Sequence, residues 1–318
     1  MVSSDLAVDD YLGASVVTNG TYIVVGAYGK AGNSGAVYIY GLSGGNWVQL
    51  QKLTTAATGE AFGFSLALSG NRLVIGAPYA NLYRGAAYIY NLSGGTWVQQ
   101  QKIVAADVAA DDVFGSSVAT NGTQVLVSSA GDESRRGAAY VFGLVGGTWT
   151  QAQKLVASDG AADDNFGQSV TMSGNTLIVG AYGDDSYRGA AYVFTTTGST
   201  WSQQQKIIAS SRTQNEGLGY SISMSGSNVA ISGAGGDVGI SSPGAAYIFS
   251  LSGATYTQQQ RFQGVVGEWF GSSVALSGGH LLVGVALASV GGTTSSGLMQ
   301  VYESAQAMPL YGMQFMHL

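Results

Sequence analysis

The residues that could carry out chemistry in this chain are few, and the most suggestive of them recur at a fixed interval. A serine follows a glycine by two positions at six places, as Gly-x-Ser does in the nucleophile elbow of hydrolases. The elbow needs a second glycine two positions later, where this chain has Ala, Val, Thr or Ser. The only histidines are His280 and His317, which argues against a histidine-based triad and a multi-histidine metal site, and cysteine is absent, so no thiolate metal site can form. General acid–base catalysis by a pair of carboxylates stays open, although nothing in the sequence marks a particular pair. We predict that the chain is not an enzyme.

Acidic residues form a second recurring group. Asp-Asp pairs precede the Phe-Gly or Leu-Gly step at Asp9-Asp10, Asp111-Asp112 and Asp163-Asp164. Calcium prefers such oxygen ligands, but aspartate also commonly caps backbone amides in turns, and we favour the capping role. A weak calcium candidate lies at Asp184 and Asp185. No other cofactor is predicted.

Three arginines stand at 52-residue intervals, each directly before a Gly-Ala pair: Arg84, Arg136 and Arg188. Acidic residues lie in the same segments before Arg136 and Arg188. Surface ion pairs, each worth less than about 1 kcal/mol, are the simpler interpretation. The alternative is a ring of arginines on one face that receives acidic or carboxylate ligands.

The elements that position these residues come from six internal repeats. Their Phe-Gly or Leu-Gly glycines are spaced by 50 or 52 residues, at Gly13, Gly63, Gly115, Gly167, Gly219 and Gly271. Serines follow two positions later, at Ser15, Ser65, Ser117, Ser169, Ser221 and Ser273.

Each repeat has the pattern of four short strands separated by turns. The first strand is typified by 117–120 of the third repeat, and the second, third and fourth strands by 73–78, 85–90 and 97–103 of the second repeat. Asn-Gly or Ser-Gly turns separate the first two strands. We predict an all-β fold, a six-bladed β-propeller with four antiparallel strands per blade. It forms a single domain over 1–318, with blades at about 9–58, 59–110, 111–162, 163–214, 215–266 and 267–318.

The last blade needs a fourth strand, and the segment from Pro309 to Met316 stands where that strand belongs. We expect it to close the blade. The alternative is that this methionine-rich segment docks on another subunit by strand addition.

Three motifs recur in fixed order in most repeats. The first is Phe-Gly-x-Ser-Val-Ala, the second is typified by Val-Ile-Gly-Ala-Pro from Val74 to Pro78, and the third by Gly-Ala-Ala-Tyr-Val-Phe from Gly189 to Phe194. Over residues 9–302 this order resembles the FG-GAP repeat, which builds the propeller of integrin α-chains and of many bacterial and viral surface proteins. Integrin propellers have seven blades, whereas six are counted here. Integrin propellers also hold calcium in an acidic loop between strands one and two, and these turns are two or three residues long without an acid.

Composition excludes some partners. The net charge of −6 and the pI of about 4.7 argue against binding of nucleic acid. The sequence has no uninterrupted stretch of eighteen apolar residues, the length needed for a membrane-spanning helix. No signal peptide is visible at the start of the chain. The family resemblance implies an extracellular location, or one at a cell or virion surface.

Propeller topology puts the loops after the second and fourth strands on one face, and these loops vary most between repeats. We predict an adhesion module that binds a protein or a glycan there. The alternative is a structural subunit of a cell-surface, phage or viral assembly that packs against neighbouring subunits. The ligand-face candidates are Tyr28, Tyr79, Tyr83, Arg84, Arg136, Tyr187 and Arg188.

Overall fold

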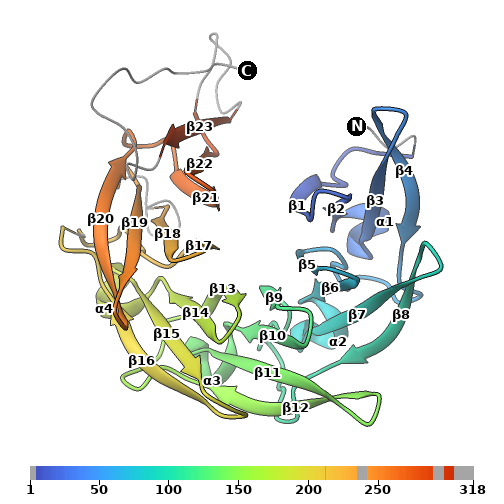
Figure 1. The fold of residues 1–318 in the computed structure, drawn as a ribbon, viewed down its shortest axis with the longest axis horizontal. Coiled ribbons are helices and arrows are strands. Elements are labelled where there is room, and N and C mark those ends of the chain that lie inside the picture. The colour runs from blue at the N-terminus through green and yellow to red at the C-terminus, as the bar shows by residue number, and fades with distance from the viewer. Residues whose placement is uncertain (1–4, 212, 235–241, 289–296, 304–318) are drawn as a thin grey trace. The chain divides into compact units, whose positions relative to one another are not determined.

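The computed structural model describes residues 5–211, 213–234, 242–288 and 297–303. It divides into two compact units, Met1–Val156 and Ala157–Leu318. Each unit consists of three consecutive antiparallel sheets, whose strands follow one another in chain order (Figure 1). We call these sheets blades 1 to 6. Six such blades confirm the predicted fold class, a six-bladed β-propeller. That they form one domain over 1–318 stays a prediction.

Blades 1 to 3 each have four strands. They are β1 (Leu12–Thr18), β2 (Tyr22–Ala27), β3 (Ala36–Ser43) and β4 (Asn46–Leu53); β5 (Ser65–Ser69), β6 (Arg72–Ala77), β7 (Ala86–Ser93) and β8 (Thr96–Ile103); and β9 (Val118–Thr120), β10 (Gln124–Ser129), β11 (Ala138–Val145) and β12 (Thr148–Leu155).

Blades 4 and 5 also have four strands, and blade 6 has three within the described residues. They are β13 (Phe166–Ser173), β14 (Thr176–Ala181), β15 (Ala190–Thr196) and β16 (Trp201–Ile207); β17 (Ser221–Ser225), β18 (Asn228–Gly233), β19 (Ala245–Ser252) and β20 (Thr255–Gln263); and β21 (Phe270–Ser277), β22 (His280–Val285) and β23 (Leu298–Glu303). The closing strand predicted at Pro309 to Met316 lies outside the described residues.

Burial patterns separate the middle strands of a blade from its outer strand. In β6 five consecutive residues are buried, because both faces of a middle strand are covered by protein. In β8, by contrast, Trp97 and Ile103 are buried, Gln101 is half-buried and the other residues are exposed. An outer strand with one face in solvent is expected to be exposed in this way.

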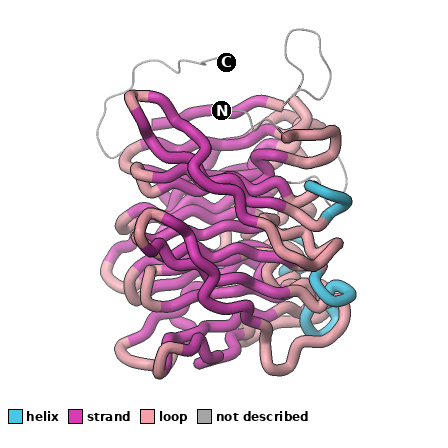
Figure 2. The backbone as a smooth tube through the Cα atoms, turned by 90° about the vertical axis from the view of Figure 1, so that its right-hand side faces the viewer, coloured by secondary structure: helices cyan, strands magenta, loops and turns pink. Residues whose placement is uncertain are grey.

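Four short helical segments, which the sequence did not predict, connect the second and third strands of blades 1 to 4. They are α1 (Lys30–Asn33), α2 (Ala80–Tyr83), α3 (Asp132–Arg135) and α4 (Asp184–Tyr187). In each blade that has one, the segment lies at one end of the strands (Figure 2). No helix in the part of the chain that is described is long and apolar enough to cross a bilayer.

These segments, which we call the 2–3 turns, are left-handed in their middle. Asn81 has φ 51° and ψ 59°, Leu82 has φ 60° and ψ 53°, and Tyr83 has φ 59°. Left-handed backbone costs about 1–2 kcal/mol per L-residue. The contacts around the turn must therefore compensate for it.

The compensating contacts come from the Phe-Gly segment of the following blade. The Val113 N–H donates to the Tyr83 carbonyl at 2.8 Å, and the Phe114 N–H donates to the Arg84 carbonyl at 3.0 Å. A parallel bridge joins Gly85 to Phe114 at this point. Equivalent pairs join blades 1 and 2 and blades 4 and 5, through the N–H groups of Ala61, Phe62, Gly217 and Leu218. The last left-handed residue of the turn and the right-handed residue after it thus present their carbonyls to the next blade.

The recurring serine adds a second contact between neighbouring blades. Ser15 Oγ donates to the Gly63 carbonyl at 2.6 Å, and Ser65 Oγ donates to the Gly115 carbonyl at 2.9 Å. In the second unit Ser169 Oγ donates to the Gly219 carbonyl at 2.7 Å. We call these serine bonds, together with the Phe-Gly bonds to the 2–3 turn, the inter-blade clasp. In these blades the Gly-x-Ser serine therefore has a structural role.

The clasp also requires close backbone approach. A Cβ atom on Gly26 would lie 2.1 Å from the Gly63 carbonyl oxygen and 2.2 Å from Ser15 Oγ. We predict that Gly26→Ala lowers the free energy of unfolding by about 3 kcal/mol, because backbone cannot yield as a flexible side chain does. The midpoint of urea unfolding measures this.

Gly143→Ala is the matched control, since a Cβ atom there would meet no heavy atom within 4 Å. It should change the free energy of unfolding by less than about 1 kcal/mol. Equal unfolding midpoints for the two variants would contradict the account of the clasp.

Candidate ligand-binding face

Five aromatic side chains form a continuous row in the first unit. The Tyr11 and Tyr28 rings stack with centroids 5.0 Å apart and an interplanar angle of 4°. The row continues from Tyr28 to Phe64 at 5.3 Å, from Phe64 to Tyr79 at 6.0 Å, and from Tyr79 to Tyr83 at 5.0 Å. We call these residues the aromatic row.

The clasp sets the position of the row. Tyr11 and Phe64 belong to the segments that enter blades 1 and 2, while Tyr28 and Tyr79 follow β2 and β6 at the start of the 2–3 turns. Tyr83 ends the left-handed part of α2, and its carbonyl accepts a hydrogen bond from Val113. The row therefore rests on backbone that neighbouring blades hold in place.

The row is open to solvent at both ends and half-buried in the middle. Tyr11 is 53% exposed and Tyr83 is 50% exposed, and Leu82 beside Tyr83 is 79% exposed. Burial, followed by the neighbouring tyrosines, raises the pKa of Tyr28 and Tyr79. Their hydroxyls therefore stay protonated at neutral pH. Flat rings with hydroxyl groups suit both protein and glycan partners.

The predicted ligand-face residues fall into two groups. Tyr28, Tyr79 and Tyr83 come together in the aromatic row, and Arg84 follows Tyr83 at the end of α2. Tyr187 and Arg188 lie in the second unit, where Tyr187 packs against Tyr182 at 5.9 Å. That these residues bind a ligand stays a prediction.

Two of the arginines make the surface ion pairs that were expected. Arg136 lies 3.5 Å from Glu133, and Arg188 lies 3.2 Å from Asp185. Both pairs are well exposed, so each contributes little to stability.

Sequence reasoning missed Tyr11 and Phe64 in the row, and Tyr182 and Tyr220 in the second unit, whose rings lie 5.9 Å apart. One signal was available. Phe64 and Tyr220 occupy the position after the Phe-Gly or Leu-Gly glycine, where the other repeats have smaller or more polar residues. Large aromatic residues at that position mark the same face.

The second aspartate of each Asp-Asp pair caps a backbone amide, as expected. A carboxylate oxygen accepts from the N–H three residues earlier at 2.6 Å for Asp10, 2.6 Å for Asp112 and 2.7 Å for Asp164. Burial is the largest influence on Asp112 and Asp164 and raises their pKa.

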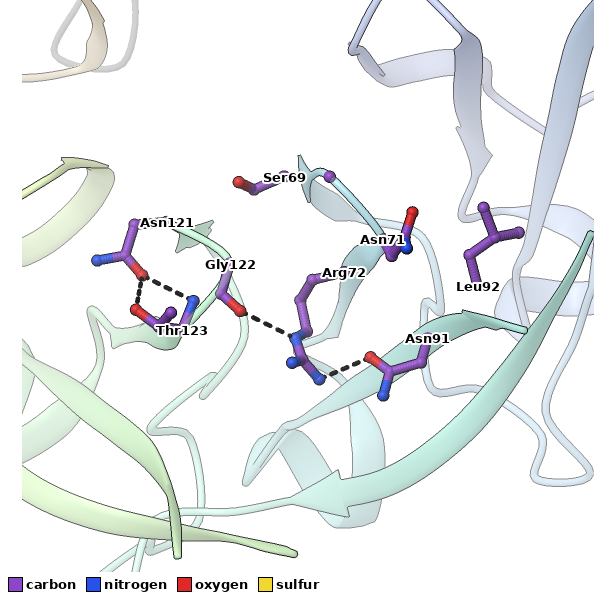
Figure 3. A pocket seen from close by; sticks show the side chains of 9 residues that line it. Ser69, Asn71, Arg72, Asn91, Leu92, Asn121, Gly122 and Thr123 are labelled. Carbon is purple, nitrogen blue, oxygen red and sulfur yellow. Dashed lines mark hydrogen bonds between the residues drawn. The ribbon is translucent and has the colours of Figure 1, made fainter. Parts of the chain in front are cut away.

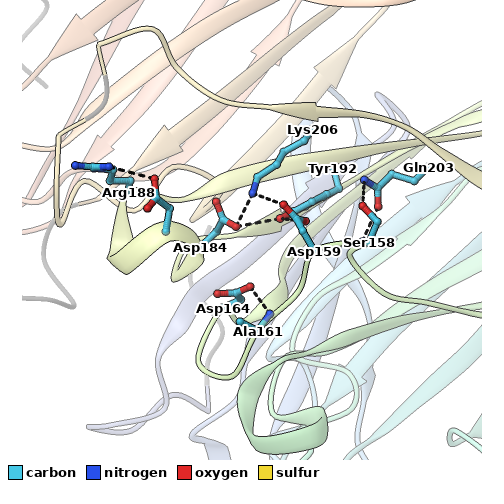
Figure 4. Close-up of polar contacts among 10 residues, drawn as sticks. Ser158, Asp159, Ala161, Asp164, Asp184, Arg188, Tyr192, Gln203 and Lys206 are labelled. Atoms are coloured by element: carbon cyan, nitrogen blue, oxygen red, sulfur yellow. Dashed lines mark hydrogen bonds and ion pairs between the residues drawn. The ribbon is translucent and has the colours of Figure 1, made fainter.

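Beneath the face, most blades join a tyrosine, a cation and one or two carboxylates. In blade 4, Lys206 Nζ lies 2.7 Å from Asp159 and 2.7 Å from Asp184, and the Tyr192 hydroxyl lies within hydrogen-bond distance of both carboxylates, at 3.0 and 3.1 Å (Figure 4). The arrangement recurs in three other blades: Lys102 with Tyr88 in blade 2, Lys154 with Tyr140 in blade 3, and Arg261 with Tyr247 in blade 5.

This network bears on the calcium candidate. Asp184 is buried against Lys206, and Asp185 pairs with Arg188. No group of three or more His, Cys, Asp or Glu side chains that could hold a metal ion occurs among the residues the model describes. The calcium site at Asp184 and Asp185 stays a prediction, and a cation would have to compete with Lys206 for it.

Comparison with known proteins identifies the repeat. The model of the FG-GAP repeat matches residues 1–40, 47–90, 97–142, 149–194 and 201–249. No curated protein matches the sequence.

Two solved structures share the fold. One is a protein provisionally named a 6-phosphogluconolactonase, from Bacteroides uniformis ATCC 8492, with a TM-score of 0.65 and 12% identity, over 92% of this chain and 81% of that one. The other is Sqt1 from Chaetomium thermophilum, with a TM-score of 0.56 and 14% identity, over 94% of this chain and 70% of that one. At these identities the likeness concerns the fold alone.

The first of these structures corrects the prediction that the chain is not an enzyme. That prediction rested on the scarcity of histidine and cysteine, which excludes particular catalytic groups. A similar fold that carries the name of a lactonase contradicts it, because the architecture itself is compatible with catalysis. The likeness assigns no reaction to this chain.

The lysine network gives a prediction on stability. Burial by itself would raise the pKa of Asp159, but hydrogen bonds from Lys206 and Tyr192 outweigh it and lower that pKa below 3.8. Lys206→Met should cost about 3 kcal/mol at pH 7, because it leaves the buried Asp184 carboxylate without its cation. Asp159 is half exposed and adds little to this loss. Urea unfolding across a pH series measures the loss.

The sign with pH follows from the lowered pKa. The ionised Asp159 carboxylate stabilises the fold above its ordinary pKa, and this contribution is lost as the pH falls through its lowered pKa in the folded chain. The loss of unfolding free energy caused by Lys206→Met should therefore shrink below about pH 4. Arg188→Met, which removes an exposed pair, should cost less than about 1 kcal/mol. A deficit that stayed constant down to pH 2 would argue against the network.

Proposed function

We propose that this chain, which belongs to the FG-GAP repeat family, is a binding module. It acts outside the cell or at the surface of a cell or virion. It contacts a protein or glycan partner through the face formed by the 2–3 turns and the segments that enter each blade. The fold is consistent with a binding or a structural module. The aromatic row is the observation that carries the proposal.

The row has the properties of an interface centre. Single exposed apolar residues are common on protein surfaces, but a contiguous aromatic strip is not. Tyrosine contributes large contact area and a hydroxyl at low conformational cost, and it is enriched among the residues that dominate binding energy.

Pre-organisation strengthens this case. The 2–3 turn of blade 2 is tied by the Tyr83 and Arg84 carbonyls to blade 3, and the Asn33 and Ser34 carbonyls tie blade 1 to blade 2. A partner therefore meets loops whose backbone is already ordered. Association then costs less conformational entropy than it would with free loops.

The proposed location rests on the family, since FG-GAP repeats are typical of extracellular proteins. The alternative, a structural subunit of a surface assembly, is favoured by apolar side chains at the opposite, hairpin end of the blades. Leu42 is 59% exposed and Val145 is 66% exposed. A neighbouring subunit would cover such residues, and a monomer at every concentration in sedimentation analysis would argue against it.

We predict that Tyr28→Ala and Tyr79→Ala each weaken partner binding by at least about tenfold, because each removes a central ring of the row. Binding of the labelled chain to a printed glycan array and to cultured cells measures the effect. Leu42→Ala is the matched control at the other end of blade 1 and should bind as the natural chain does. Unchanged binding by both tyrosine variants would refute the proposed face.

A further inference from the structure

An open pocket of about 560 Å³, lined mostly by polar residues, lies at the hairpin end of blades 2 and 3, on the opposite side from the aromatic row. Its walls are the turn between β5 and β6, the turn between β9 and β10, and part of β7 (Figure 3). Its lining includes Ser69, Asn71, Arg72, Asn91, Asn121 and Thr123. The volume is within the range of small-molecule sites.

Arg72 is the only charged residue of the lining, and both walls hold it in place. Its Nη1 donates to Asn91 Oδ1 of β7 at 2.6 Å, and its Nε donates to the Gly122 carbonyl at 3.4 Å. The guanidinium carbon lies 4.6 Å from the centre of the Trp149 ring. The side chain is therefore ordered before any ligand arrives.

This cation lacks a countercharge. No carboxylate lines the pocket, and Arg72 makes no ion pair with any residue in the described ranges. Burial lowers the pKa of Arg72, which reflects the cost of removing the guanidinium from water. The two hydrogen bonds use two of its five N–H donors, so donors remain for a ligand.

The packing of the blades does not require this charge. The residue that begins the second strand is Tyr22, Arg72, Gln124, Thr176, Asn228 and His280 in successive repeats, so only blade 2 has arginine. In blade 1, Tyr22 makes the corresponding contact with Trp97, ring edge to ring face at 5.7 Å. A neutral side chain thus fills the same place, and the arginine needs another explanation.

We propose that this pocket binds a small sugar acid, whose carboxylate pairs with the Arg72 guanidinium. The planar guanidinium fork matches a carboxylate in two parallel hydrogen bonds. The Asn71 amide and the Ser69 hydroxyl offer donors and acceptors to the ligand's hydroxyl groups. The site is separate from the aromatic row, so either can fail without the other.

Titration calorimetry of the full chain with three probes tests the site. Glucuronate carries both the carboxylate and the hydroxyls, glucose lacks the carboxylate, and acetate lacks the hydroxyls. We expect glucuronate to bind at least about tenfold more tightly than either of the others, since both groups of contacts are needed. Equal binding of glucose, equal binding of acetate, or no heat with glucuronate would each overturn the proposal.

Variants locate the binding. Arg72→Gln should lower glucuronate affinity at least about tenfold, while Arg72→Lys keeps the charge, loses the fork and should be intermediate. Arg135→Gln, an exposed arginine of α3, is the control and should bind as the natural chain does. Full affinity in a folded Arg72→Gln chain would overturn the assignment. If that variant does not fold, the three probes on the natural chain still decide.

Discussion

The inter-blade clasp is the constraint on which the other features depend. Phe62 shows its logic: the ring is fully buried beside Tyr88 and Tyr90 of its own blade, while its N–H bonds to Ser34 of the preceding blade. One residue thus ties two neighbouring blades together. The 2–3 turns direct two carbonyls at this segment, and the resulting inter-blade bonds help to offset the strain of the positive φ angles.

The clasp also explains why the two ends of the blades differ. At the 2–3 end, turns and entering segments are tied together, so the rings of Tyr28 and Phe64 meet although they come from different repeats. At the hairpin end the turns are short, and the Arg72 side chain reaches across to the Gly122 carbonyl of the next blade. The first end suits a broad partner surface, and the second suits a small ligand.

Much of the fold could be predicted because its signals repeat. The Phe-Gly spacing, together with short β-branched and aromatic runs bounded by Gly-rich turns, predicted six blades and their turns. The left-handed turns could not be predicted, since Asn81-Leu82-Tyr83 and Glu133-Ser134-Arg135 share a backbone but no composition. The missed rings, Tyr11 and Phe64, become neighbours only when blades 1 and 2 pack. The prediction of no enzyme was wrong because residue scarcity restricts particular mechanisms and does not restrict the fold.

Amide hydrogen exchange on the free chain, followed by NMR, tests the clasp most directly. The Phe62 and Phe114 amides lie outside every strand, yet both donate to the preceding blade. If the clasp holds the blades, these amides should exchange as slowly as that of Val127 in the buried strand β10. Exchange as fast as that of Gly45, in the exposed hairpin between β3 and β4, would contradict the account.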